Sequence, residues 1–162
     1  MRAGMFTTPL LAALMCLAAP PIGLADAAAG EQVGRQSVDL FFETLVPLLD
    51  RASRTELRHV MGERGLRCRV RKRGTRVDCP VNGRTRFLGR FESEVMWAVL
   101  LVSVQKGACP AILERAQELL GEPSSIEEGW HRWSAEGQSH VTAFRDKVGC
   151  QLLRAPEADE EE

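Results

Sequence analysis

Hydrophobic and polar positions along the chain follow three patterns, and each predicts a different kind of segment. The first is a run of Leu, Ala and Met, almost free of charge, over residues 5–19 after the basic Arg2. This run is about 15 residues long, whereas a membrane-spanning helix needs roughly 20. Small residues follow, with an Ala-x-Ala sequence that ends at Ala27, as signal peptidase requires. We therefore expect residues 1–27 to be a cleaved signal peptide, although cleavage after Ala29 fits nearly as well.

The second pattern, apolar residues spaced by three and four, predicts three helices in the mature chain. An Ala/Gly/Gln-rich stretch over 28–36 comes first, and we expect it to be a flexible lead-in. The first helix begins at Ser37 and is bent or ended by Pro47. The second begins with a capping-box sequence at 53–56, in which a Ser oxygen and a Glu carboxylate each accept from a free backbone amide. The third covers 109–120, with proline in its first turn.

The third pattern is strict alternation, which predicts antiparallel strands. Apolar and charged residues alternate over 66–71 and again over 76–79, with a turn at 73–74 between them. Folding the chain about this turn makes a hairpin in which Cys68 lies opposite Cys79. An Asn-Gly turn signal follows the hairpin and starts a further strand.

Five segments, including the strand 84–91 that follows the Asn-Gly turn, complete the predicted sheet. The run 95–105 is β-branched and apolar on both faces, which favours a central strand, with a buried helix as the alternative. The remaining expected strands cover 84–91, 130–135, 138–144 and 148–153.

The order of these elements is helix, helix, four strands, helix, three strands (ααββββαβββ). Strands grouped in this way predict an α+β fold, with helices packed on one face of a largely antiparallel sheet. We assign this single domain to residues 37–154. Residues 155–162 form an acidic tail without apolar anchors, which we expect to be disordered.

Four cysteines remain once Cys16 leaves with the signal peptide, and an even number favours disulfides in an oxidising compartment. Directly opposed residues of a hairpin lie at a Cα separation that a disulfide accepts. We therefore predict Cys68–Cys79 and, by exclusion, Cys109–Cys150. The signal peptide and the predicted disulfides lead us to expect the protein in the periplasm or outside the cell, with no transmembrane segment after cleavage. The scarcity of lysine beside arginine is typical of a GC-rich, bacterial genome.

Basic residues are concentrated in one stretch of the chain. The mature chain is nearly neutral, but residues 64–90 hold ten basic side chains against Asp78 alone. Alternation places most of them on one face of a three-stranded sheet, which would attract lipid headgroups, lipopolysaccharide, another polyanion or an acidic protein. Nucleic acid is not expected there, because the protein is exported and no aromatic residue lies on that face to stack bases. The candidate binding residues are Arg67, Arg69, Arg71, Lys72, Arg73, Arg76, Arg84, Arg86 and Arg90.

Three other interpretations of this stretch stay open. The arginines can simply form a solvated sheet face, or the chain's own acidic tail can fold back and mask them. The hairpin tip 71–73, braced by a disulfide, can also serve as the rigid basic loop of a secreted inhibitor of a protease or another enzyme.

No catalytic motif stands out elsewhere in the sequence. The chain lacks a nucleophile elbow, HExxH, a P-loop, a dinucleotide fingerprint and CxxC, so we predict a non-enzymatic protein without a cofactor. His131 and His140 fall on facing strands, and pairing about 136–137 sets Trp133 opposite His140. Zinc needs three or four ligands, so this pattern favours a His–Trp surface cluster and no metal site.

Overall fold

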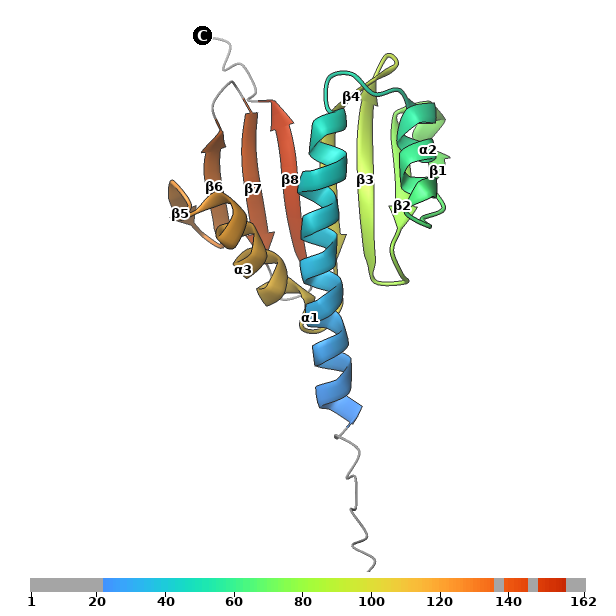
Figure 1. Ribbon diagram of the computed structural model, residues 1–162. Coiled ribbons are helices and arrows are strands. Elements are labelled where there is room, and N and C mark those ends of the chain that lie inside the picture. Colours follow the sequence, from blue (N-terminus) through green and yellow to red (C-terminus); the bar gives the residue numbers. More distant parts are fainter. Residues whose placement is uncertain (1–21, 136–138, 146–148, 157–162) are drawn as a thin grey trace, which may run out of the picture.

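The computed structural model describes residues 22–135, 139–145 and 149–156 of the 162-residue chain. Its helices and strands are shown in Figure 1. The helices are α1 (Ile22–Leu40), α2 (Arg54–Glu63) and α3 (Ala108–Leu120). The strands are β1 (Arg69–Arg71), β2 (Arg76–Pro80), β3 (Thr85–Glu92), β4 (Val95–Ser103), β5 (Ser125–Glu127), β6 (Trp130–Ala135), β7 (Ser139–Arg145) and β8 (Cys150–Pro156).

The eight strands form one antiparallel sheet in the order β1-β2-β3-β4-β8-β7-β6-β5. The two halves of the chain share a plan, since each consists of a helical segment followed by four strands. They join where β4 pairs with β8, the last strand of each half. The α+β fold is therefore confirmed, with one more strand than predicted, the short β5.

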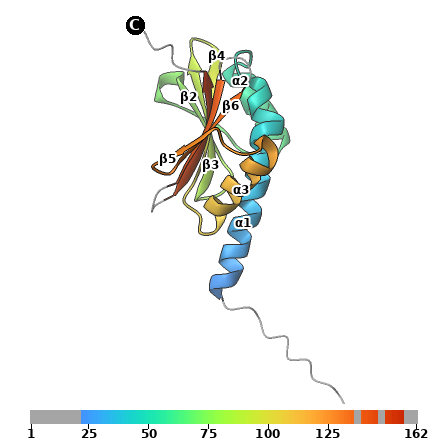
Figure 2. The same ribbon diagram turned by 90° about the vertical axis from the view of Figure 1, so that its left-hand side faces the viewer.

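Figure 2 shows all three helices on one face of the sheet, while no described element covers the other face. We call this second face the open face. Alternate residues of β3, among them Phe87 and Phe91, are buried against the helices. The segment 95–105 forms strand β4 over Val95–Ser103, and the helix alternative is wrong. It is apolar on both faces because β4 lies in the middle of the sheet with β3 and β8 on either side.

The arginine-rich hairpin has the predicted register. Val70 lies opposite Val77 and Arg69 opposite Asp78. Cys68 and Cys79 form a disulfide with a Cα–Cα distance of 4.1 Å. This bond ties the residue before β1 to the second strand of the hairpin, β2.

The capping box of α2 is also present. The Glu56 amide donates to Ser53 Oγ at 3.2 Å, and the Ser53 amide donates to Glu56 Oε2 at 2.7 Å. The backbone hydrogen bond from Ser53 lowers the pKa of the Glu56 carboxyl below its ordinary value. The segment before it ends as predicted, because a short 3₁₀ turn over Val46–Leu48 contains Pro47 and the chain is extended at Leu49.

The beginning of the first helix differs from the prediction. Residues 28–36 are no flexible lead-in, because they belong to α1, which continues through Ser37 without a break. The reason is packing against α3. A Cβ on Gly30 would overlap the carbonyl oxygen of Lys106, and one on Gly34 would lie 2.7 Å from the carbonyl oxygen of Ala108. The small residues of the stretch let two helices approach closely, so tertiary contact makes it helical.

Charged side chains fasten the same pair of helices. Arg35 of α1 contacts Glu118 of α3 at 3.0 Å and Glu114 at 2.9 Å. Arg115 of α3 contacts Asp39 of α1 and Glu118, each at 2.7 Å. Hydrogen bonds from Arg35 and Arg115 lower the pKa of Glu118, and those to Glu118 raise the pKa of both arginines.

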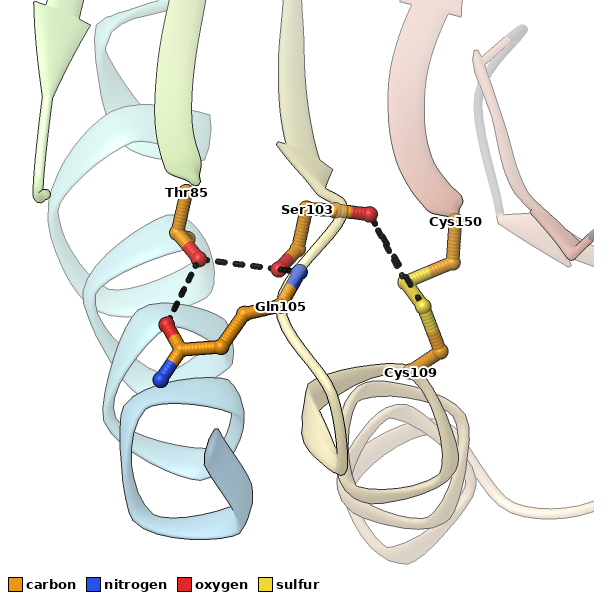
Figure 3. Close-up of a disulfide and its surroundings, with 5 residues drawn as sticks. All are labelled: Thr85, Ser103, Gln105, Cys109 and Cys150. Atoms are coloured by element: carbon orange, nitrogen blue, oxygen red, sulfur yellow. Dashed lines mark hydrogen bonds between the residues drawn. A yellow bond between two sulfur atoms is a disulfide. The ribbon is translucent and has the colours of Figure 1, made fainter. Parts of the chain in front are cut away.

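The second predicted disulfide, Cys109–Cys150, joins the start of α3 to the start of β8, with a Cα–Cα distance of 5.5 Å. Figure 3 shows that its sulfur atoms lie beside the carbonyl oxygen of Ser103, at the end of β4. There the Ser103 hydroxyl contacts that of Thr85 at 2.8 Å. The Gln105 amide donates to Ser103 Oγ at 3.2 Å. A covalent and a polar contact thus fix β3, β4, β8 and α3 at this end of the sheet.

The C-terminal boundary also shifts. Strand β8 runs to Pro156, so Ala155 and Pro156 belong to the sheet and not to the acidic tail. Residues 157–162, like residues 1–21 with most of the predicted signal peptide, lie outside the described part of the chain.

Candidate functional site

The arginine-rich stretch divides between the open face and the ends of its strands. In β1, β2 and β3 the residues that alternate with the buried Val77 and Phe87 point away from the helices. Five of the nine candidate residues occupy such positions on the open face: Arg69, Arg71, Arg76, Arg86 and Arg90. The predicted basic face is therefore built from fewer residues than the sequence offered.

The other four candidates lie elsewhere. Lys72 and Arg73 form the 3₁₀ turn that closes the first hairpin. Arg67 lies just before β1, and Arg84 lies in the turn before β3. All four side chains are exposed. They extend the positive field around the open face without belonging to its strands.

Three arginines of the open face lie in one line across three strands. Arg71 of β1 is directly opposite Arg76 of β2, and Arg76 is directly opposite Arg90 of β3. We call these three residues the arginine row. Side chains in directly opposed positions have Cβ atoms about 4.5–5.5 Å apart, and like charges placed so are destabilising.

No described acidic side chain lies directly opposite a residue of the arginine row, although Asp78 lies two residues from Arg76 along β2 and Glu92 two residues from Arg90 along β3. Among the described residues, none of its three side chains takes part in an ion pair. Arg54 shows the contrast, since its guanidinium contacts Glu94 at 2.8 Å and lies over the ring of Phe91. In the row, Arg76 Nε is buried without a hydrogen-bond partner in the described structure.

One buried carboxylate lies among these arginines. Asp78 is 8% exposed, lies opposite Arg69, and contacts Arg86 through Oδ2 at 3.5 Å. It neutralises the end of the face nearest Arg86. Asp78 lies two residues from Arg76 along β2, so it is next to the arginine row but forms its ion pair with Arg86 and not with a residue of the row.

A strip of leucines continues across the open face from Asp78. The register places Leu88 of β3 opposite Asp78, Leu100 of β4 opposite Leu88, and Leu153 of β8 opposite Leu100. Sequence reasoning missed this strip, because it depends on β8 pairing with β4, which no local pattern reveals. The one local signal for an apolar position on this face was Leu88, which lies on the same side of its strand as Arg86 and Arg90.

The tip of the hairpin is a tight turn. Lys72 and Arg73 both have positive φ, 48° and 54°, and Thr75 closes the turn by donating through its amide to the carbonyl oxygen of Lys72 at 3.2 Å. The Thr75 hydroxyl donates to the same oxygen at 2.9 Å. The tip therefore presents its basic side chains from a compact helical turn.

The histidine prediction was wrong in its register. Trp133 lies opposite Val141, and His140 lies opposite Ser134. The error is one residue, because Ala135 pairs with Ser139 and the connection is longer than the assumed two-residue turn. His131 does stack on Trp133, with ring centroids 6.1 Å apart, but Trp133 is 4% exposed and belongs to the core, so the pair is not the expected surface cluster. Within the described residues, no three metal-ligating side chains gather.

Two open pockets lie away from the arginine row. One, of about 460 Å³, lies between the start of α1 and the start of α3. It is lined by small residues together with Glu31 and Glu114. The other, about 610 Å³, lies at the β5–β6 turn beside Trp130 and Arg132.

No described helix is long and apolar enough to cross a bilayer. The two disulfides indicate an oxidising compartment outside the cytoplasm.

Comparison with protein-family models, with curated proteins and with solved structures finds no match to this chain. The candidate site therefore rests on the geometry of the open face.

Proposed function

We propose that this protein is an exported, non-enzymatic binding protein that engages an anionic partner through its arginine row. One observation carries the proposal: Arg71, Arg76 and Arg90 lie opposite one another on an uncovered sheet face, and no described acidic side chain pairs with them. The signal-like N-terminal segment and the two disulfides support export to the periplasm or beyond the cell.

The chemistry of the row favours an anion with several acceptor oxygens. Each guanidinium offers a planar fork of N–H donors that matches phosphate, sulfate or carboxylate. An anion that bridges neighbouring arginines replaces their mutual repulsion with attraction. The same contact would supply a partner for the buried Nε of Arg76. Lipid headgroups, lipopolysaccharide, other polyanions and acidic proteins all provide such groups in this compartment.

The inhibitor alternative draws less support from the hairpin tip. A protease reads its substrate as an extended segment, whereas Lys72 and Arg73 lie in a turn with positive φ. That turn would have to open before Arg73 could enter a trypsin-like site. A panel of trypsin-like proteases separates the two ideas, because simple cleavage at the tip rules out inhibition.

Heparin resin and vesicles with anionic headgroups test the proposal directly. The protein should bind both at low salt and elute as salt screens the contact. The triple variant Arg71→Gln, Arg76→Gln, Arg90→Gln should elute at much lower salt. A matched control, Arg58→Gln, Arg64→Gln, Arg132→Gln, loses the same charge from exposed positions off the row. Equal weakening in both variants would show that net charge alone, not the row, accounts for binding.

A further inference from the structure

The end of the described chain lies at the same end of the sheet as the arginine row. Strand β8 runs antiparallel to β4, with Arg154 opposite Val99, and Ala98 next to Val99 lies opposite Arg90. Pro156, two residues beyond Arg154, therefore leaves the sheet at the level of the row. Figure 1 shows this end of β8 at the same end of the sheet as the tip of the β3–β4 hairpin.

Six residues follow Pro156, with the sequence Glu-Ala-Asp-Glu-Glu-Glu, and five of them are acidic. Six extended residues span at most about 20 Å. Neighbouring strands lie about 4.8 Å apart, so Arg90 on β3 is roughly 10 Å from the end of β8 and Arg76 on β2 roughly 14 Å. The acidic segment is therefore long enough to reach both arginines.

We propose that the C-terminal segment 157–162 of this chain binds the arginine row of its own open face. The segment brings five carboxylates to three guanidiniums that have no described acidic partner. The occupant is intramolecular, so it acts at the effective concentration of a short tether, in the millimolar range. An external anion must displace it before binding.

This arrangement gives the protein a built-in selectivity. At low salt a single monovalent anion competes poorly with five tethered carboxylates, whereas a dense polyanion competes well. The row then binds a partner with many closely spaced negative groups in preference to small anions. The inference uses the same row as the proposed function, but does not require that any external partner exists.

Arginine Nε–H resonances in ¹H–¹⁵N spectra test the inference without an external ligand. The full mature chain is compared with a chain that ends at Pro156. Removing the segment should shift the signals of Arg76 and Arg90 and leave that of Arg84, at the far end of β3, unchanged. A variant with the five acidic residues replaced by amides, E157Q, D159N, E160Q, E161Q and E162Q, should give the truncated spectrum. About 0.5 M NaCl should do the same to the full chain.

Three results would overturn the inference. The first is identical spectra of the full and truncated chains. The second is shifts confined to arginines off the row, which would place the segment elsewhere. The third is a difference that disappears on dilution, which would assign the segment to a second copy of the chain.

Heparin binding by the same two chains keeps this inference separate from the proposed function. If the spectra agree but the truncated chain binds heparin through the row, only the tail inference fails. If the row signals shift on truncation but neither chain binds heparin or anionic vesicles, the tail inference stands and the external partner fails. If both hold, truncation should move heparin elution to higher salt, and the Gln variant of the row should abolish most of that gain.

Discussion

Arg76 of β2 lies directly opposite Arg90 of β3 on a sheet face that no described element covers. A fold that places two guanidiniums in opposed positions gives up stability there. Arg71 extends the arrangement to a third strand. Other arginines of the same protein form ion pairs with acidic residues, as Arg35 and Arg115 do on the helical face. The opposed charges of the row therefore carry a cost in stability that can be measured.

Replacing Arg90 by threonine should raise the free energy of unfolding by about 0.2–1 kcal/mol, because it removes a directly opposed like charge and adds a β-branched residue. Urea denaturation at low salt measures this change. The matched control is Arg86→Thr on the same strand, which removes the contact of the buried Asp78 and should lower stability by about 1–3 kcal/mol. Loss of stability in Arg90→Thr would mean that the row serves the fold.

Gly34→Ala should destabilise the protein by about 1–3 kcal/mol, since the added methyl group meets the carbonyl oxygen of Ala108 across the α1–α3 contact. Gly62→Ala is the control. It lies in α2 with open space around its Cβ position and should be stabilising by up to about 1 kcal/mol. Thermal unfolding of both variants measures the difference in their stability. A neutral Gly34→Ala would contradict the docked position of α1.

The two disulfides should differ in what they contribute. Cys109–Cys150 closes a loop with a sequence separation of 41, and Cys68–Cys79 one of 11. The loop-entropy relation gives about 4 kcal/mol for the first and about 3 for the second. Urea unfolding of the two double Cys→Ser variants compares them. Tryptic cleavage at the hairpin tip gives a second check, because the fragments should stay joined until reduced.

Acid should loosen the α1–α3 contact through Glu118. Hydrogen bonds from Arg35 and Arg115 lower the pKa of its carboxyl, so this stabilisation is present above the ordinary glutamate pKa. It is lost as pH falls below that ordinary value and through the lowered one. Unfolding measured between pH 3 and 6 should therefore show a shallower acid-side decline for Glu118→Gln than for the unaltered protein. Glu31→Gln, at an exposed position of the same pair of helices, should leave the decline unchanged.

Local signals were enough for the hairpin and for α2. Alternation over 66–79 fixed both the register and the first disulfide, because directly opposed residues follow from a two-fold period and a short turn. The capping box likewise set the start of α2. These elements depend on neighbours in the sequence, so the sequence reveals them.

Elements that depend on distant partners were missed. The stretch 28–36 carries no apolar periodicity, and it is helical because Gly30 and Gly34 lie against α3. The three-residue β5 contains one apolar residue, Ile126, which is too little pattern to predict a strand.

The candidate site shows the same division. Alternation placed arginines on one face, but only the pairing of β2 with β3 shows which three of them line up. The leucine strip beside them needs the further pairing of β4 with β8.

The most direct test of the arginine row is a titration of the full mature chain with a heparin-derived hexasaccharide at low salt, followed through arginine Nε–H resonances. The account predicts saturable shifts at Arg71, Arg76 and Arg90 that disappear in the triple Gln variant. Small, unsaturable shifts spread equally over all surface arginines, including Arg58 and Arg132, would contradict it.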